Sequence, residues 1–71
     1  MEKKIFIEGM SCEHCVKHVT AALKDLSGVT KVEVNLAGKY AILDTFEDIK
    51  EEDIKTVVDE AGYEVTKIEA H

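Results

Sequence analysis

The chain has 71 residues, and its 15 acidic residues against nine lysines and no arginine give a formal net charge of −6 at pH 7. This length predicts a single domain over residues 1–71. The acidic balance and the lack of arginine, the residue best suited to bidentate contact with phosphate, argue against nucleic acid as a ligand.

No segment approaches the roughly 20 apolar residues of a membrane span, and the N-terminal apolar run is too short for a signal-peptide core. We therefore expect a soluble, cytoplasmic protein without direct membrane insertion. Eight of the 15 acidic residues lie between Asp44 and Glu60. Such a cluster is typical of a solvated helix face, and a docking patch for a basic partner is the alternative.

The first half of the chain predicts a strand, a helix and a second strand. Residues 3–8 alternate, with Ile5 and Ile7 on one face and Phe6 on the solvent face. Apolar residues at helical spacing predict an amphipathic helix over residues 13–26, with Ser11 as its candidate cap. Residues 31–36 alternate again and predict the second strand.

The chain then predicts a hairpin and a second helix. Ala37 and Gly38 indicate a tight hairpin that leads into a strand at residues 39–46. Residues 48–51 resemble a capping sequence for the helix that follows, and Gly62 is its expected end.

A last strand is expected at residues 63–69, with Tyr63, Val65 and Lys67 on one side and Ile68 unassigned. The resulting order is strand, helix, strand, strand, helix, strand. This order predicts an α+β fold, a ferredoxin-like βαββαβ sandwich in which two helices cover one face of a four-stranded antiparallel sheet.

The only two cysteines, Cys12 and Cys15, lie in the segment Gly-Met-Ser-Cys-Glu-His-Cys between the first strand and the first helix. The N-terminus of a helix favours thiolate, so both sulfurs are candidate nucleophiles or soft metal ligands. The three-residue spacing allows both to contact one ion.

Several kinds of site share this motif. A haem attachment site needs His directly after the second cysteine, where this chain has Val16. A structural zinc cage needs a second ligand pair, and the chain offers only His18 nearby and His71 at its end. A thiol oxidoreductase remains the alternative from another class, although the thioredoxin fold is longer and this chain has no proline. Two thiolates on their own suit Cu(I), which accepts low coordination numbers.

The Gly-Met-x-Cys-x-x-Cys motif after a strand, the later Gly-Tyr-Glu-Val at residues 62–65 and the βαββαβ order together resemble the heavy-metal-associated domain family, most closely its small bacterial copper chaperones. The resemblance covers essentially the whole chain. It implies a protein that is not an enzyme, that binds Cu(I) through Cys12 and Cys15, and that delivers the ion by thiolate exchange to the metal-binding domains of a copper-transporting P-type ATPase.

The resemblance leaves other roles open. The chain could be a relative, or an ATPase-derived domain, that handles Zn(II), Cd(II) or Hg(II), although Ser11 rather than a carboxylate precedes Cys12, which favours Cu(I). A copper-responsive repressor is a second candidate partner. The metal-free chain is expected to be a monomer, and a metal-bridged dimer is the further option.

Three residues near the motif have a structural and a functional interpretation each. Met10 is expected to pack in the core beneath the loop, although its thioether could serve as a ligand. His14 is expected to face solvent, with an auxiliary role for Zn(II) as the alternative that His18, one turn later, supports. Tyr63 is expected to lie beside the metal site without binding the ion, or else to anchor its strand to the core.

Overall fold

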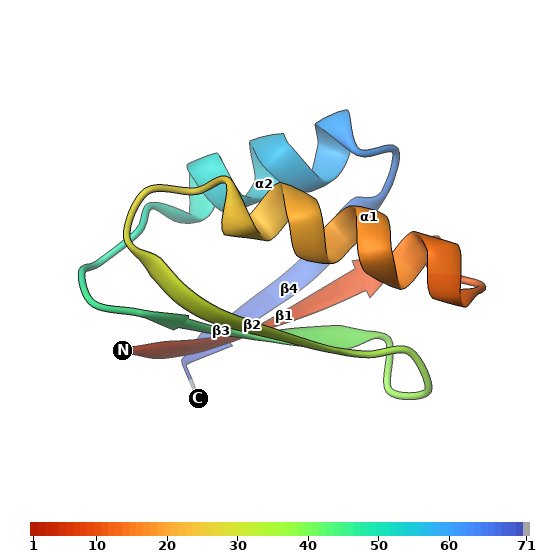
Figure 1. Ribbon diagram of the computed structural model, residues 1–71, viewed down its shortest axis with the longest axis horizontal. Helices are drawn as coiled ribbons and strands as arrows, with labels where there is room; N and C mark the ends of the chain where they lie inside the picture. The colour runs from red at the N-terminus through yellow and green to blue at the C-terminus, as the bar shows by residue number, and fades with distance from the viewer. Residues whose placement is uncertain (71) are drawn as a thin grey trace.

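The computed structural model describes residues 1–70 and contains the six predicted elements in the predicted order. They are β1 (Glu2–Glu8), α1 (Glu13–Lys24), β2 (Val29–Asn35), β3 (Tyr40–Thr45), α2 (Glu51–Glu60) and β4 (Glu64–Ala70). His71 lies outside the described residues. All strand pairs are antiparallel in the order β2-β3-β1-β4, and both helices cover the same face of the sheet (Figure 1). The predicted ferredoxin-like fold is confirmed.

The core lies between the sheet and the two helices, because alternation in the strands and helical spacing in the helices both direct apolar side chains to that layer. Alternate residues of the central strands β1 and β3 point toward the helices, and residues four apart on each helix point back at them. The fully buried members are Ile5, Ile7, Ala41, Leu43, Val19, Leu23, Ile54 and Val58. Complete burial of one such Leu, Ile or Val side chain contributes about 1.5–3 kcal/mol.

The strand β4 contains an irregularity that the alternating pattern did not reveal. Ile5 pairs with Ile68 and Phe6 with Lys67, but Ile7 then pairs with Val65, so Thr66 is an extra residue on β4. This bulge shifts the alternation by one residue. Ile68 therefore faces the core side together with Val65, and the placement of Lys67 on that side was wrong because its side chain is exposed.

Both expected helix caps were also wrong. Cys12 is the N-cap of α1 and Lys50 is the N-cap of α2, and neither helix has a side-chain cap hydrogen bond. Ser11 lies one residue too early to cap α1. Asp48 instead forms an ion pair with Lys3, whose Nζ lies 3.5 Å from the carboxylate and also donates to the Ile49 carbonyl at 3.1 Å.

The connection between β2 and β3 is longer than the predicted two-residue hairpin. Residues 36–39 form the turn, and β3 begins at Tyr40. Lys39 has a φ of 58°, and its carbonyl accepts a hydrogen bond of 2.9 Å from the Ile7 backbone N–H. The turn is thereby fastened to the end of β1.

The outer face of the sheet carries a small aromatic cluster. The rings of Phe6 and Tyr40 meet edge to face with centroids 6.2 Å apart, and the Lys4 ammonium lies 4.3 Å from the Tyr40 centroid. Phe6 therefore lies on the outer face, as the alternation predicts, and is half-buried among these neighbours.

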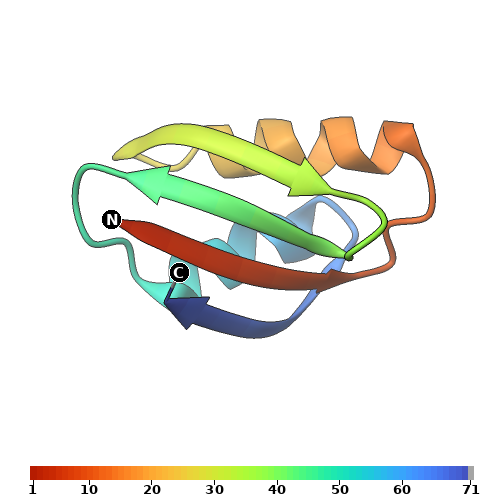
Figure 2. The ribbon, with the colours of Figure 1, turned by 90° about the horizontal axis from the view of Figure 1, so that it is seen from below.

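Three connections lie together at one end of the molecule. They are the β1–α1 loop, the β2–β3 turn and the α2–β4 loop, whereas the N-terminus and residue 70 lie toward the other end (Figures 1 and 2). The β1–α1 loop, which leads to Cys12 and Cys15, thus lies at the same end of the molecule as the α2–β4 loop, which carries Tyr63. Within residues 1–70, neither helix is long and apolar enough to cross a membrane.

Candidate metal centre

The two cysteine sulfurs lie side by side at the start of α1. Cys12 is extended (φ −157°, ψ 172°), and the helix begins at the next residue. The carbonyl of Cys12 accepts hydrogen bonds from the N–H groups of Cys15 at 3.1 Å and Val16 at 3.3 Å. This first turn brings the two Sγ atoms to 3.5 Å from each other, and both cysteines are unbridged. Cys12 is exposed and Cys15 is half-buried.

The surroundings of Cys15 favour its thiolate. Hydrogen bonds from the Ser11 backbone, the Tyr63 hydroxyl and the Cys12 thiol lower the pKa of Cys15 from 9.0 to about 6. At neutral pH the sulfur is therefore mostly ionised, which is the form that binds metals and attacks electrophiles.

The end of α2 directs Tyr63 toward this sulfur. Gly62 has a φ of 95°, and its N–H donates to the Asp59 carbonyl at 2.9 Å, while the Tyr63 N–H donates to the Val58 carbonyl at 3.1 Å. These two bonds form a Schellman motif, which turns the chain sharply after the helix. Tyr63 comes directly after Gly62, so the turn at this glycine determines where the Tyr63 ring lies.

The ring of Tyr63 packs against the metal-loop backbone at Gly9. A Cβ atom built on Gly9 would lie 3.3 Å from Tyr63 Cδ1, and Gly9 also has a φ of 98°. The hydrogen bond to Cys15 raises the pKa of Tyr63, because the phenol must keep its proton to donate. Tyr63 is therefore a neutral donor beside the thiolate. The predicted proximity of Tyr63 to the cysteines is seen in the structure.

The other candidate residues lie apart from the sulfur pair. Met10 is only 6% exposed and belongs to the core cluster, so its thioether packs beneath the loop. His14 and His18 are both exposed on α1. Among residues 1–70, no three His, Cys, Asp or Glu side chains gather into a group that could hold one metal ion.

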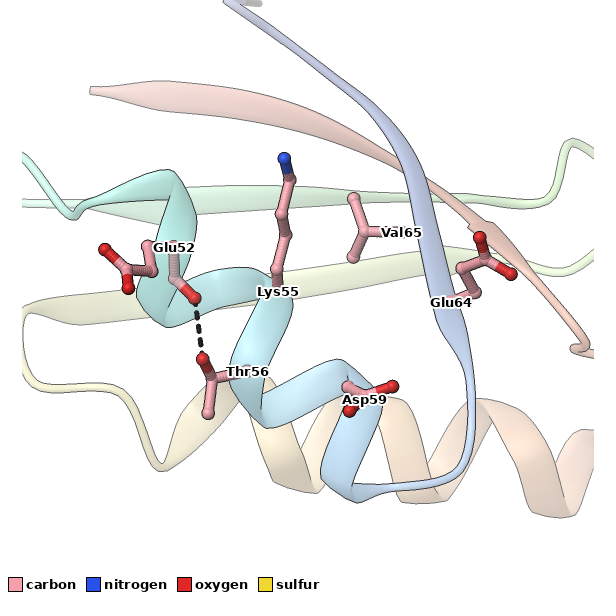
Figure 3. A pocket seen from close by; sticks show the side chains of 6 residues that line it. All are labelled: Glu52, Lys55, Thr56, Asp59, Glu64 and Val65. Atoms are coloured by element: carbon pink, nitrogen blue, oxygen red, sulfur yellow. Dashed lines mark hydrogen bonds between the residues drawn. The ribbon is translucent and has the colours of Figure 1, made fainter.

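One hollow lies elsewhere, between α2 and β4 (Figure 3). It has a volume of about 460 Å³ and is lined by Glu52, Lys55, Thr56, Asp59, Glu64 and Val65. A second hollow of about 240 Å³ lies between the helices. Neither is lined by a cysteine. A two-sulfur site needs no cavity, because its ligands converge on the ion from the surface of a loop.

The chemistry of the pair follows from its geometry. Two thiolates select soft ions, and Cu(I) accepts two or three sulfur ligands, whereas structural zinc sites use four ligands.

The sequence predicted the two cysteines and Tyr63 as residues of the site, but it did not predict the Ser11 backbone donor or the close contact between Gly9 and Tyr63. The glycine before Met10 was the available signal for that contact.

Comparisons with known proteins identify the family of this chain. Residues 4–64 match the heavy-metal-associated domain. The copper chaperone CopZ of Bacillus subtilis (strain 168) is 40% identical over 67 residues, which cover 93% of this chain and 97% of the relative. A solved copper-binding domain from HMA7, a P-type ATPase, is 38% identical with a TM-score of 0.85, covering 99% of this chain and 96% of that chain. The N-terminal domain of ZntA in its Zn(II) form is 28% identical with a TM-score of 0.80, covering 90% and 86%. The chain belongs to the heavy-metal-associated domain family.

Proposed function

We propose that this protein is a Cu(I) chaperone that carries one ion on Cys12 and Cys15. The observation that carries the proposal is the pair of sulfurs 3.5 Å apart at an exposed helix start, one of which has a pKa of about 6. Cys15 thus supplies a thiolate at neutral pH, and the two sulfurs together satisfy the coordination preference of Cu(I) without further protein ligands. The similarity to the Bacillus subtilis copper chaperone supports copper as the cargo.

Delivery would proceed by exchange of thiolates. An incoming thiolate of the receiving protein attacks the bound Cu(I) and forms a three-coordinate intermediate. One cysteine sulfur of this chain then leaves, and a second incoming thiolate displaces the other. The copper remains Cu(I) throughout, so no oxidant or reductant is needed. The exposure of Cys12 supports this route, because a partner sulfur can reach the ion from the solvent side.

The partner we propose is a metal-binding domain of a copper-transporting P-type ATPase, in the cytoplasm. The similarity to a copper-binding domain of such an ATPase supports this choice, since donor and acceptor would present matching sites to each other. We propose no catalytic activity. The metal-free chain is expected to be monomeric, and sharing of thiolates between two copies would appear as a metal-dependent dimer in size-exclusion chromatography.

An anaerobic titration of the reduced protein with Cu(I), in competition with a chromogenic chelator, tests the proposal. We expect one ion per chain and a large loss of affinity in Cys12→Ser and in Cys15→Ser, because each removes one of two ligands. The proposal is wrong if either variant binds Cu(I) as tightly as the parent. Comparable binding of Zn(II) in the same competition would favour the alternative to which the Zn(II) form of the ZntA domain points.

The thiol oxidoreductase alternative has a separate measurement. Two sulfurs at 3.5 Å need to move only about 1.5 Å closer to form a disulfide of about 2.05 Å. Turnover of a protein disulfide substrate by the reduced chain would favour that alternative. We expect stoichiometric oxidation without turnover.

A further inference from the structure

A second pair of metal-binding side chains lies on α1, outside the cysteine site. His14 and His18 occupy positions i and i+4 of a 12-residue helix, and both side chains are exposed. Residues with this spacing lie one turn apart on the same face, with Cβ atoms about 5–6 Å apart. Two imidazoles at this separation can bind the same ion, as in zinc sites built on a His-x-x-x-His helix.

The pair lies on the solvent side of the helix. Val19 and Leu23 mark the buried side of α1. Ala21 and Ala22, the next residues that could overlie His18, are small and leave its imidazole uncovered. Neither histidine takes part in an ion pair within residues 1–70. One ring nitrogen of His14 and one of His18 are therefore accessible to a metal ion.

The histidine pair is separate from the thiolate pair. Cys15 packs against the edge of the core and contacts Tyr63, whereas the histidines face outward. No group of three ligating side chains forms among the described residues, so the two pairs do not merge into one site. The ligand chemistry also differs, because imidazole suits borderline divalent ions such as Zn(II), Ni(II) and Cu(II), while paired thiolates suit Cu(I).

We propose that His14 and His18 form a second metal site on the outer face of α1, which binds one Zn(II) or a similar borderline divalent ion. Two imidazoles leave the other coordination positions to water. The positive end of the helix dipole and the nearby Lys17 both oppose a cation here, so binding is weaker than at a four-ligand zinc site.

The experiment uses the full chain with Cys12→Ser and Cys15→Ser, so that no thiolate competes for zinc, and circular dichroism verifies its fold. Zinc chloride is titrated by calorimetry, with NMR spectra of the imidazoles as a second readout. We expect one ion per chain and shifts in the NMR signals of the His14 and His18 imidazoles. Either His14→Gln or His18→Gln should lower the zinc affinity by about 10-fold or more, because loss of an outer-shell residue alone typically costs that much. If the doubly substituted chain does not fold, the parent with both thiols alkylated replaces it.

A matched control keeps the composition constant. The double substitution His18→Lys and Lys24→His exchanges two exposed residues of α1 and keeps the net charge, but it places the helix histidines ten residues and about 15 Å apart, too far to share one ion. We expect this variant to bind zinc as weakly as His18→Gln. The proposal is wrong if this control binds zinc as tightly as the parent background. It is also wrong if His18→Gln leaves the zinc affinity unchanged, or if the chain binds no zinc at all. Cu(I) binding by His18→Gln with native cysteines should equal that of the parent, so the two proposals fail separately.

Discussion

Two glycines provide a direct test of how the metal loop is supported. Gly9 and Gly62 have nearly the same backbone conformation, with φ of 98° and 95°. An alanine in this region places Cβ close to backbone oxygen and costs roughly 1–2 kcal/mol. Substitution of either glycine should therefore destabilise the protein by this common backbone amount.

The two sites differ in what a new Cβ would meet. At Gly62 nothing lies within 4 Å, whereas at Gly9 the Cδ1 atom of Tyr63 lies at 3.3 Å. This separation is shorter than the optimal carbon–carbon contact of about 3.5–4.0 Å, so the ring must move. Crowding of this kind typically costs about 1–3 kcal/mol. Gly9→Ala should be the more destabilising substitution by about that amount, which lowers the melting temperature by about 4–8 °C per kcal/mol in a domain of this size.

Urea and thermal unfolding of the reduced, metal-free proteins measure both effects, and a double-mutant cycle separates them. In a Tyr63→Ala background the ring is absent, so Gly9→Ala should cost no more than Gly62→Ala. If Gly9→Ala and Gly62→Ala are equally destabilising in the parent, the ring contact does not support the loop. If Gly62→Ala is neutral, the backbone part of the reasoning fails.

Four further predictions concern the thiolate, the loops and the acidic surface. Tyr63→Phe removes a donor and should raise the pKa of Cys15 above about 6, seen as a shift in the pH profile of iodoacetamide alkylation, and an unshifted profile would contradict the hydrogen bond. Because folding lowers that pKa from 9.0 to about 6, the unfolded chain binds more protons between these values, and stability in urea should rise from pH 6 to pH 9. Cys15→Ser should flatten this rise, and an equally steep rise would show that other groups cause it. Lys3→Met removes the bond to the Ile49 carbonyl and should cost about 1 kcal/mol, more than Asp48→Asn, which breaks only an exposed ion pair. If α2 steers a basic partner, added salt should slow copper transfer, and a salt-independent rate would remove that role.

The sequence predicted those parts of the fold that depend on local periodicity. Six elements follow from alternation and helical spacing, since burial of one face dictates both patterns. The bulge at Thr66 could not be read in this way, because an extra residue is defined only by the partner strand. The expected cap at Asp48 failed for a similar reason, since Lys3, far away in the sequence, binds its carboxylate.

The candidate site shows the same division. The spacing of Cys12 and Cys15 sufficed to predict that their sulfurs meet, because three residues at a helix start determine the geometry. The lowered pKa of Cys15 also depends on Tyr63, which reaches the loop only after the sheet has formed and α2 has ended at Gly62. The pKa of Cys15 thus depends both on the local backbone at Ser11 and on the tertiary fold that brings Tyr63 to the loop.

The missing side-chain cap of α1 connects stability with the proposed transfer. A Ser, Thr, Asp or Asn cap would typically stabilise the helix by about 1 kcal/mol, yet Cys12 stands at that position without a side-chain cap hydrogen bond. The backbone N–H groups of the first turn therefore remain available to offset the negative charge of the thiolates. Cys12→Asp should restore a cap and stabilise the metal-free fold while it abolishes tight Cu(I) binding. Urea unfolding and the chelator competition on the same sample would decide this, and a variant that is no more stable than Cys12→Ala, which cannot cap, would refute the explanation.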